Sequence, residues 1–158
     1  MKVTEQYLEK INACGIGIRW FCAQTETDSV KIIKKLIKEN HTDWASWFIC
    51  RLFNKKQKAM YAIYAAKSVL KRFEKKYPND KRARQAIEAA GNYLKSPCKK
   101  TKTAADAAYA AAYAAAYAAK ATASAAAYAA KATADAAARK KLRLKILKYG
   151  LTLLEVRS

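Results

Sequence analysis

The side chains that most often carry out catalysis are sparse in this sequence, and their spacing does not match a catalytic arrangement. Enzymes need a nucleophile beside a base, a pair of carboxylates or a bound metal ion. The single histidine, His41, rules out a multi-histidine metal site, and the most closely spaced carboxylates are those of Glu26 and Asp28. The sequence has no phosphate-binding loop and no G-x-G-x-x-G segment. We therefore expect no catalytic residues and a protein that acts by binding.

The cysteines and the N-terminus indicate a protein of a reducing compartment. Cys14, Cys22, Cys50 and Cys98 include no C-x-x-C pair, the spacing typical of zinc ribbons and redox sites. The N-terminus lacks the apolar core of a secretory signal. The longest charge-free part of the alanine-rich region, 107–119, is too short to span a bilayer. We expect a cytoplasmic protein that binds no metal or other cofactor, and peripheral membrane binding through the basic segment 139–154 stays as a third alternative to a protein or nucleic-acid partner.

The chain carries a large excess of positive charge. It has 32 lysines and arginines against 12 aspartates and glutamates, which gives a formal charge of +20. Runs of basic residues occur at 31–38, 55–58, 67–76, 95–102 and 139–148. Such a field attracts acidic protein surfaces, nucleic acids and nucleotides. Net charge alone does not choose among these partners, and it leaves open whether the chain forms homo-oligomers.

Tyrosines interleaved with lysines give the nucleic-acid alternative specific candidate residues. Lys55, Lys56 and Lys58 lead into Tyr61 and Tyr64, a composition typical of surfaces where cations meet phosphates and rings stack on bases. The further candidates of this kind are Tyr109, Tyr113, Tyr117, Lys120 and Lys131. The other interpretation is that Tyr61 and Tyr64 belong to the core and the lysines form a solvated face. No helix-turn-helix, zinc-finger or RNA-recognition signature decides between them.

Apolar periodicity and capping residues predict a chain of helices without strands. The predicted helices are 3–13 ending near Gly15 and Gly17, 28–38 capped by Asp28 or Ser29, 42–52 capped by Thr42 or Asp43, 55–77 ended by Pro78, and 80–94. The segment 141–146 alternates basic and apolar residues and could be either a strand or a helix. The lone His41, beside a predicted cap, is interpreted as an ordinary surface residue.

The alanine-rich region predicts one long helix or two antiparallel helices. Residues 117–127 and 128–138 match at ten of eleven positions, and no glycine or proline interrupts 99–149. The chain then closes with a basic amphipathic helix. Its expected inward residues are Leu142, Ile146, Leu147, Leu151 and Leu154, and its expected solvent-facing residues are Arg139, Lys140, Arg143 and Lys148. We expect an all-α multi-helix bundle in which a unit of residues 1–98 packs with the alanine-rich 99–158 as one domain.

Three segments of the middle region resemble a known family. They are Asp-Trp-Ala-Ser-Trp-Phe-Ile-Cys-Arg at 43–51, Tyr-Ala-Ile-Tyr-Ala-Ala at 61–66, and the stretch 73–90 with Pro78, Asp80, Arg82, Arg84 and Glu88. From about Asp43 to the C-terminus the chain is similar to the "putative immunity protein" family, alanine-rich helical proteins of bacteria and their phages. Two positions depart from that family's pattern: Ala83 stands where a proline is usual, and the alanine tract lacks the histidine that many members carry.

The resemblance implies a non-enzymatic protein, in a bacterium or a phage-infected host, that neutralises a toxin or defence component by direct contact. An acidic surface on that protein partner would suit the basic chain. The candidate partner-binding residues are Trp44, Trp47, Arg51, Asp80, Arg82, Arg84 and Glu88. Two alternatives stay open. The arginines could pair within the fold, for example Arg84 with Glu88, and the two tryptophans could belong to the core rather than form exposed anchors.

Overall fold

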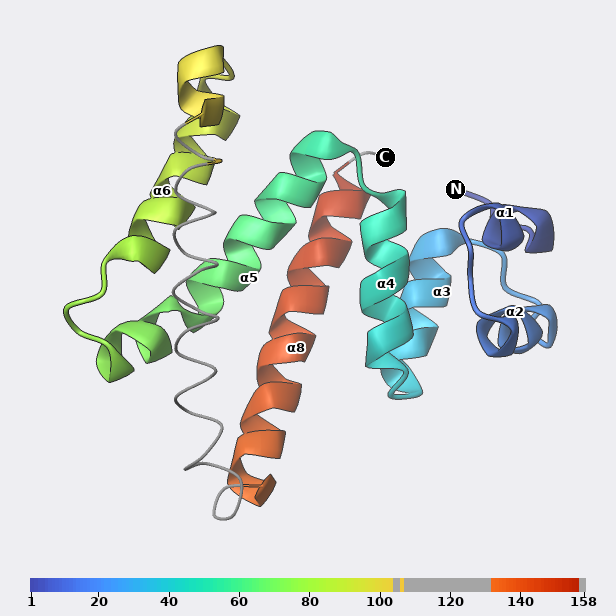
Figure 1. Ribbon diagram of the computed structural model, residues 1–158. Helices are drawn as coiled ribbons and strands as arrows, with labels where there is room; N and C mark the ends of the chain where they lie inside the picture. The colour runs from blue at the N-terminus through green and yellow to red at the C-terminus, as the bar shows by residue number, and fades with distance from the viewer. Residues whose placement is uncertain (104–105, 107–131, 157–158) are drawn as a thin grey trace. The chain divides into compact units, whose positions relative to one another are not determined.

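The structure, a computed structural model, describes residues 1–103, 106 and 132–156, and it is all-α within those residues (Figure 1). This confirms the predicted fold class. The helices are α1 (Glu5–Lys10), α2 (Gly15–Cys22), α3 (Ser29–Lys38), α4 (Thr42–Leu52), α5 (Lys55–Lys76), α6 (Arg82–Lys95) and α8 (Ala132–Glu155). The segment 141–146 lies inside α8, so its alternating pattern belongs to a helix. The extended residues include one isolated antiparallel bridge, between Lys2 and Asp28.

The start of α3 follows the sequence prediction. Asp28 is its N-cap, and the Asp28 Oδ1 atom accepts hydrogen bonds from the backbone N–H groups of Val30 and Lys31, each at 3.0 Å. The apolar face of the helix is buried at Ile33 and Leu36. A capping carboxylate and one apolar face are therefore enough to define this helix from sequence.

The helix predicted over 3–13 is present but shorter, and the predicted role of the two glycines after it was wrong. The first helix ends at Lys10, and Asn12 then takes a left-handed conformation with φ of 59°. Asparagine tolerates this conformation better than most residues, so it can turn the chain. Gly15 and Gly17 do not stop a helix but lie in the first turn of α2. A Cβ atom at Gly17 would lie 3.3 Å from the Sγ atom of Cys14, which explains why a small residue suits this turn.

The predicted cap of the helix over 42–52 was wrong. His41, not Thr42 or Asp43, precedes α4, and its side chain makes no capping hydrogen bond. The side chains of Thr42 and Asp43 instead contact α8: Arg143 Nη1 lies 3.3 Å from Thr42 Oγ1 and 2.6 Å from Asp43 Oδ1. A tertiary contact has therefore replaced the local one.

The chain divides into two compact units. The first unit comprises Met1–Asn54 and Arg143–Ser158, and the second comprises Lys55–Leu142. In the first unit the C-terminal part of α8 lies beside α3 and α4 (Figure 1), held by the Arg143–Asp43 pair and by Lys34 and Glu155 at 2.9 Å. Leu147, Leu151 and Leu154 are buried, as their apolar face predicted. Two segments that are distant in the sequence thus form one core.

The second unit contains a hairpin of the antiparallel helices α5 and α6 (Figure 1). The first of them, α5, covers nearly the predicted range and ends before Pro78, because proline cannot continue a helix. The eleven-residue repeats at 117–138 lie largely outside the described residues. The prediction of one long helix or two antiparallel helices over 99–149 is therefore not tested. The predicted boundary after residue 98, between an N-terminal unit and the alanine-rich region, also stays a prediction.

Candidate functional site

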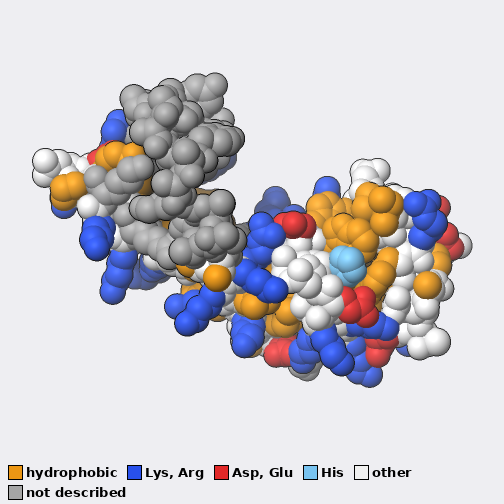
Figure 2. Space-filling model, turned by 90° about the horizontal axis from the view of Figure 1, so that it is seen from below, with side chains coloured by type: hydrophobic (Ala, Val, Ile, Leu, Met, Phe, Trp, Pro, Cys, Tyr) orange, Lys and Arg blue, Asp and Glu red, His pale blue; other side chains and the backbone are white. Residues whose placement is uncertain are grey.

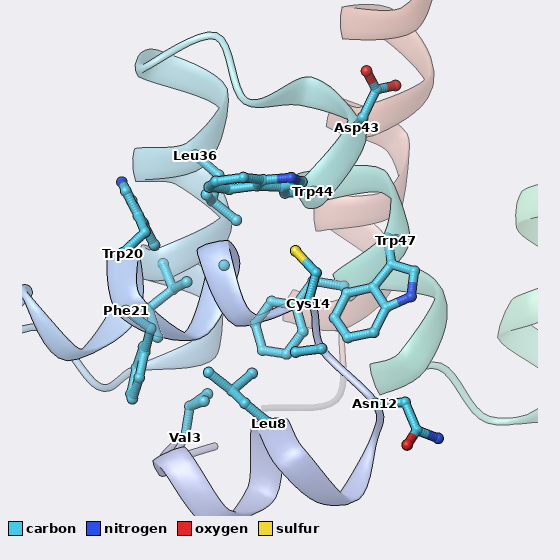
Figure 3. Close-up of a pocket in the computed structure, with 14 residues that line it drawn as sticks. Val3, Leu8, Asn12, Cys14, Trp20, Phe21, Leu36, Asp43, Trp44 and Trp47 are labelled. Atoms are coloured by element: carbon cyan, nitrogen blue, oxygen red, sulfur yellow. The ribbon is translucent and has the colours of Figure 1, made fainter.

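The first unit contains an apolar pocket of about 340 Å³ between α1, α2, α3 and α4 (Figure 3). Its lining residues are Val3, Leu8, Asn12, Ala13, Cys14, Gly17, Trp20, Phe21, Ile32, Leu36, Asp43, Trp44, Trp47 and Phe48. We call it the tryptophan pocket, because all three tryptophans of the chain line it. The short helices α1 and α2 form one side, and α3 and α4 form the other.

Three rings are packed together at one edge of the tryptophan pocket. His41 stacks on Trp44 with 4.5 Å between ring centroids and 11° between planes. Trp20 approaches both rings edge-on, at 6.3 Å from His41 and 6.4 Å from Trp44. Such edge-to-face pairs are a favoured geometry for aromatic side chains. The sequence suggested that His41 is an ordinary surface residue. The structure shows instead that its ring stacks on Trp44 and supports the position of that side chain.

A hydrogen bond joins this ring cluster to the basic face of α3. Trp20 Nε1 donates to Glu39 Oε2 at 2.8 Å, and Lys35 lies 4.0 Å from the same carboxylate group. Beyond them is a groove lined by Glu26, Lys31, Lys34, Lys35, Lys38 and Glu39. The pocket therefore has an apolar interior and a lysine-rich neighbour on α3.

Trp47 lies at the opposite edge of the tryptophan pocket, and a cation lies over its ring. The Arg51 guanidinium carbon is 5.3 Å from the centroid of Trp47, a cation–π contact. Trp47 also stacks against buried Phe48, with 6.4 Å between centroids. Trp44, Trp47 and Arg51, three of the predicted partner-binding residues, thus lie together along α4. Both tryptophans are half-buried, so neither of the two alternatives, core or exposed anchor, describes them fully.

The polar side chains of the tryptophan pocket are few. Figure 3 shows the Cys14 sulfur directed into the space between Trp44 and Leu8, and Asn12 and Asp43 at the margins. The Asp43 carboxylate is paired with Arg143. Hydrophobic side chains also gather around the histidine on one face of the molecule (Figure 2). An apolar pocket with few polar groups is suited to bind an apolar group, and its side chains include no arrangement of nucleophile and base.

The remaining predicted partner-binding residues lie in the second unit, and the two arginines among them pair with carboxylates of the fold. Arg82 forms a bidentate contact with Asp80, at 2.9 and 2.8 Å, and Arg84 forms one with Glu74 of α5, at 2.7 and 2.8 Å. These hydrogen bonds hold the pKa of Asp80 and of Glu74 below its usual value. Glu88 is exposed on α6. The carboxylate that binds Arg84 is therefore Glu74, not the predicted Glu88.

The nucleic-acid candidates are only partly brought together. Lys55, Lys56 and Lys58 are exposed on α5, but the ring of Tyr61 is buried and that of Tyr64 is half-buried. A buried ring cannot stack on a base, so Tyr61 fits the interpretation as a core residue. The other five candidates, Tyr109, Tyr113, Tyr117, Lys120 and Lys131, lie outside the described residues.

Sequence reasoning missed Trp20 and His41 as parts of the site, along with the pocket-facing Cys14. Trp20 lies in a segment that was not predicted to be helical, and the only available signal was its apolar neighbours Ile18 and Phe21. Among the described residues, no group of histidine, cysteine and carboxylate side chains is arranged to hold a metal ion. Within the same residues no helix has both the length and the apolar composition needed to cross a bilayer.

Comparison with known proteins identifies the family. Residues 49–157 match the model of the family described as "Imm-5 like putative immunity protein". Neither the curated proteins nor the solved structures gave a match. The matched segment covers well over half of the chain and contains the Arg82 and Arg84 pairs as well as most of the alanine-rich region. The chain therefore belongs to the Imm-5 like putative immunity protein family.

Proposed function

We propose that this chain is a non-enzymatic immunity protein that neutralises a toxin or defence component by direct contact with it. The observation that carries the proposal is membership of the family, since the family name implies a protein partner in general. A protein that blocks its target by contact needs a recognition surface but no catalytic group. The tryptophan pocket, with half-exposed tryptophans and no nucleophile–base arrangement, fits that requirement.

The charge distribution favours an acidic partner. The second unit, residues 55–142, contains 20 lysines and arginines but only five acidic residues. In the α5–α6 hairpin, Glu74 and Asp80 are each engaged by an arginine. The exposed lysines Lys55, Lys56 and Lys58 of α5 make no ion pair with any described residue. Lysines of this kind attract an acidic surface and speed its association, most strongly at low salt.

The face of α4 is the best candidate for the centre of the contact. Tryptophan and arginine are the residues most enriched among binding hot spots, and Trp44, Trp47 and Arg51 lie along one helix. Arg82 and Arg84, in contrast, already pair with carboxylates in the fold. We therefore assign the larger share of partner affinity to the α4 residues and a structural role to the two arginines.

Nucleic-acid binding is the second candidate, and the exposed lysines at the start of α5 are the observation that favours it. The discriminating measurement is fluorescence anisotropy with short single- and double-stranded nucleic acids over a salt series. If the charge is a diffuse field, binding should be weak and should vanish as salt approaches the physiological range. Binding that persists there and prefers one strand type would support the nucleic-acid function instead.

The direct test is capture of the partner from a nuclease-treated lysate, followed by reconstitution with the purified partner. The wild-type chain should retain a protein that rebinds in purified form and loses its toxic activity in the complex. The double variant Trp44→Ala, Trp47→Ala should lose the complex, while Arg82→Gln should retain it. If the chain captures proteins only from an untreated lysate and none after nuclease treatment, nucleic acid mediates the capture and the proposal of a protein partner is wrong.

A further inference from the structure

Most of the tryptophan pocket comes from the part of the chain that precedes the family match. Its lining residues run from Val3 to Phe48, and the family match begins at residue 49. Family membership therefore does not account for the walls that α1, α2 and α3 form, although Trp44 and Trp47 lie in the segment 43–51 that resembles the family. The pocket is also not closed over by the first unit, because Trp20, Trp44 and Trp47 all stay partly exposed at its edges. A solvent-facing cavity with this lining calls for an explanation of its own.

The size and lining of the pocket define the group that it can take. A volume of about 340 Å³ is at the small end of the range for ligand pockets, which extends from roughly 300 to 1,000 Å³. It therefore suits one ring-sized apolar group rather than an extended ligand. Trp20 already meets Trp44 and His41 edge-on, and an entering ring could add to these contacts in the same geometry. The pocket thus favours a single aromatic group.

The charges beside the pocket indicate what that group is attached to. Two carboxylates beside the pocket are already engaged, Asp43 by Arg143 and Glu39 by the Trp20 indole N–H. By contrast, Arg51 over Trp47 and Lys38 in the α3 groove make no ion pair with any described residue. Cations without partners on both sides of an apolar pocket complement a ring that is flanked by acidic residues.

We propose that the tryptophan pocket binds one aromatic side chain carried on an acidic segment of the protein partner, and that this contact selects the partner. The inference rests on the proposed function, because the segment belongs to the protein that is neutralised. The family-matched region provides the lysine-rich surface, which attracts many acidic proteins. The pocket distinguishes among them by requiring a ring at one position, as a buried anchor does in other interfaces.

The first test uses the wild-type chain and three short synthetic peptides, with isothermal titration calorimetry as the readout. One peptide is rich in aspartate and glutamate with a central phenylalanine, the second replaces that phenylalanine by alanine, and the third has lysines around the phenylalanine. The acidic phenylalanine peptide should bind roughly 10- to 100-fold more tightly than the alanine peptide, as burial of one phenylalanine implies. The lysine peptide should bind more weakly than both. Equal binding of the two acidic peptides would overturn the proposal, because charge alone would then explain it.

The second test fills the pocket and has a matched control on the same helix. Cys14 points into the pocket, and as the N-cap of α2 it makes no side-chain capping hydrogen bond, so Cys14→Phe should occupy the space without removing such a bond. Cys22 is also exposed, ends α2 and does not line the pocket, so Cys22→Phe is the control. Cys14→Phe should lose the preference for phenylalanine over alanine, and Cys22→Phe should keep it. The wild-type peptide comparison stands even if a variant fails to fold.

Failure of this inference can be told apart from failure of the proposed function. If Cys14→Phe neutralises the purified partner as well as the wild type does, the pocket does not select the partner and the proposed function still stands. If the acidic phenylalanine peptide binds in the pocket but no protein partner is neutralised, the proposed function fails and the pocket chemistry stands. An Arg51→Gln variant should weaken binding of the acidic peptide several-fold. If Arg51→Gln binds the acidic peptide as tightly as the wild type does, Arg51 is not part of the binding site.

Discussion

Replacing Leu147 by alanine should destabilise the first unit, although most of that unit lies at the other end of the sequence. The Leu147 side chain is 0% exposed and belongs to the part of α8 that packs with Met1–Asn54. Burial of the carbon groups that the substitution removes contributes roughly 2 kcal/mol to the free energy of unfolding, at about 0.8 kcal/mol for each group. The cavity left behind raises the expected loss in the free energy of unfolding to about 3–4 kcal/mol. In a unit of this size, that loss lowers Tm by more than about 10 °C.

Urea denaturation followed by tryptophan fluorescence measures this effect where it should occur. All three tryptophans lie in the first unit, so their emission reports its unfolding, while far-UV circular dichroism reports the helices of the whole chain. Lys145→Ala, at an exposed position of the same helix, is the control and should stay within about 0.5 kcal/mol of the wild type. A loss below about 1 kcal/mol for Leu147→Ala would refute the packing of α8 with the N-terminal helices.

Three further predictions follow from individual side chains. Asp28→Ala should lower the free energy of unfolding by about 1 kcal/mol through loss of the α3 N-cap, and Asp28→Asn should recover most of it. Backbone hydrogen bonds lower the pKa of Asp28 in the folded chain. The contribution of Asp28 to the free energy of unfolding should therefore be complete above the pKa that this residue has in the unfolded chain, and it should disappear as pH falls through its pKa in the folded chain. An acid denaturation series would measure this. Hydrogen bonding with Thr101 lowers the pKa of Cys98, whereas partial desolvation and the nearby Glu5 raise the pKa of the exposed Cys22. Alkylation near neutral pH followed by mass spectrometry should therefore modify Cys98 first. Glu74→Gln should lose the bidentate contact with Arg84 and weaken the α5–α6 hairpin at neutral pH. The same substitution should have no such effect in acid, because the wild-type carboxylate is itself protonated there. Equal effects at both pH values in a thermal melt would contradict this.

Sequence reasoning succeeded where a structure is set by neighbouring residues. The all-α class, the Asp28 cap of α3 and the end of α5 before Pro78 depend on periodicity and capping within a few positions. The buried face of the C-terminal helix, including Leu147 and Leu151, also followed from spacing alone. Each of these features is local and repeats with the period of a helix, so one sequence is sufficient to predict it.

Sequence reasoning failed where the deciding contact was distant or where a usual breaker served another purpose. Gly15 and Gly17 were interpreted as the end of a helix, which hid α2 and with it Trp20 and one side of the tryptophan pocket. The partner of Arg84 was sought one turn along its own helix, but it is Glu74 on the preceding helix. Arg143 is exposed, as predicted, but its pairing with Asp43, about a hundred positions earlier in the chain, was not foreseen. No local pattern contains this information.

The most direct test of direct-contact neutralisation is a titration of the purified partner's toxic activity with the wild-type chain. A protein that blocks its target by binding should reduce the activity linearly, and inhibition should be complete when the two proteins are equimolar. The acidic phenylalanine peptide, added in excess, should compete with the partner and restore part of the activity. Complete inhibition by a small fraction of an equivalent would contradict the account, because it would mean that each molecule of this chain inactivates many copies of the partner and therefore acts as an enzyme.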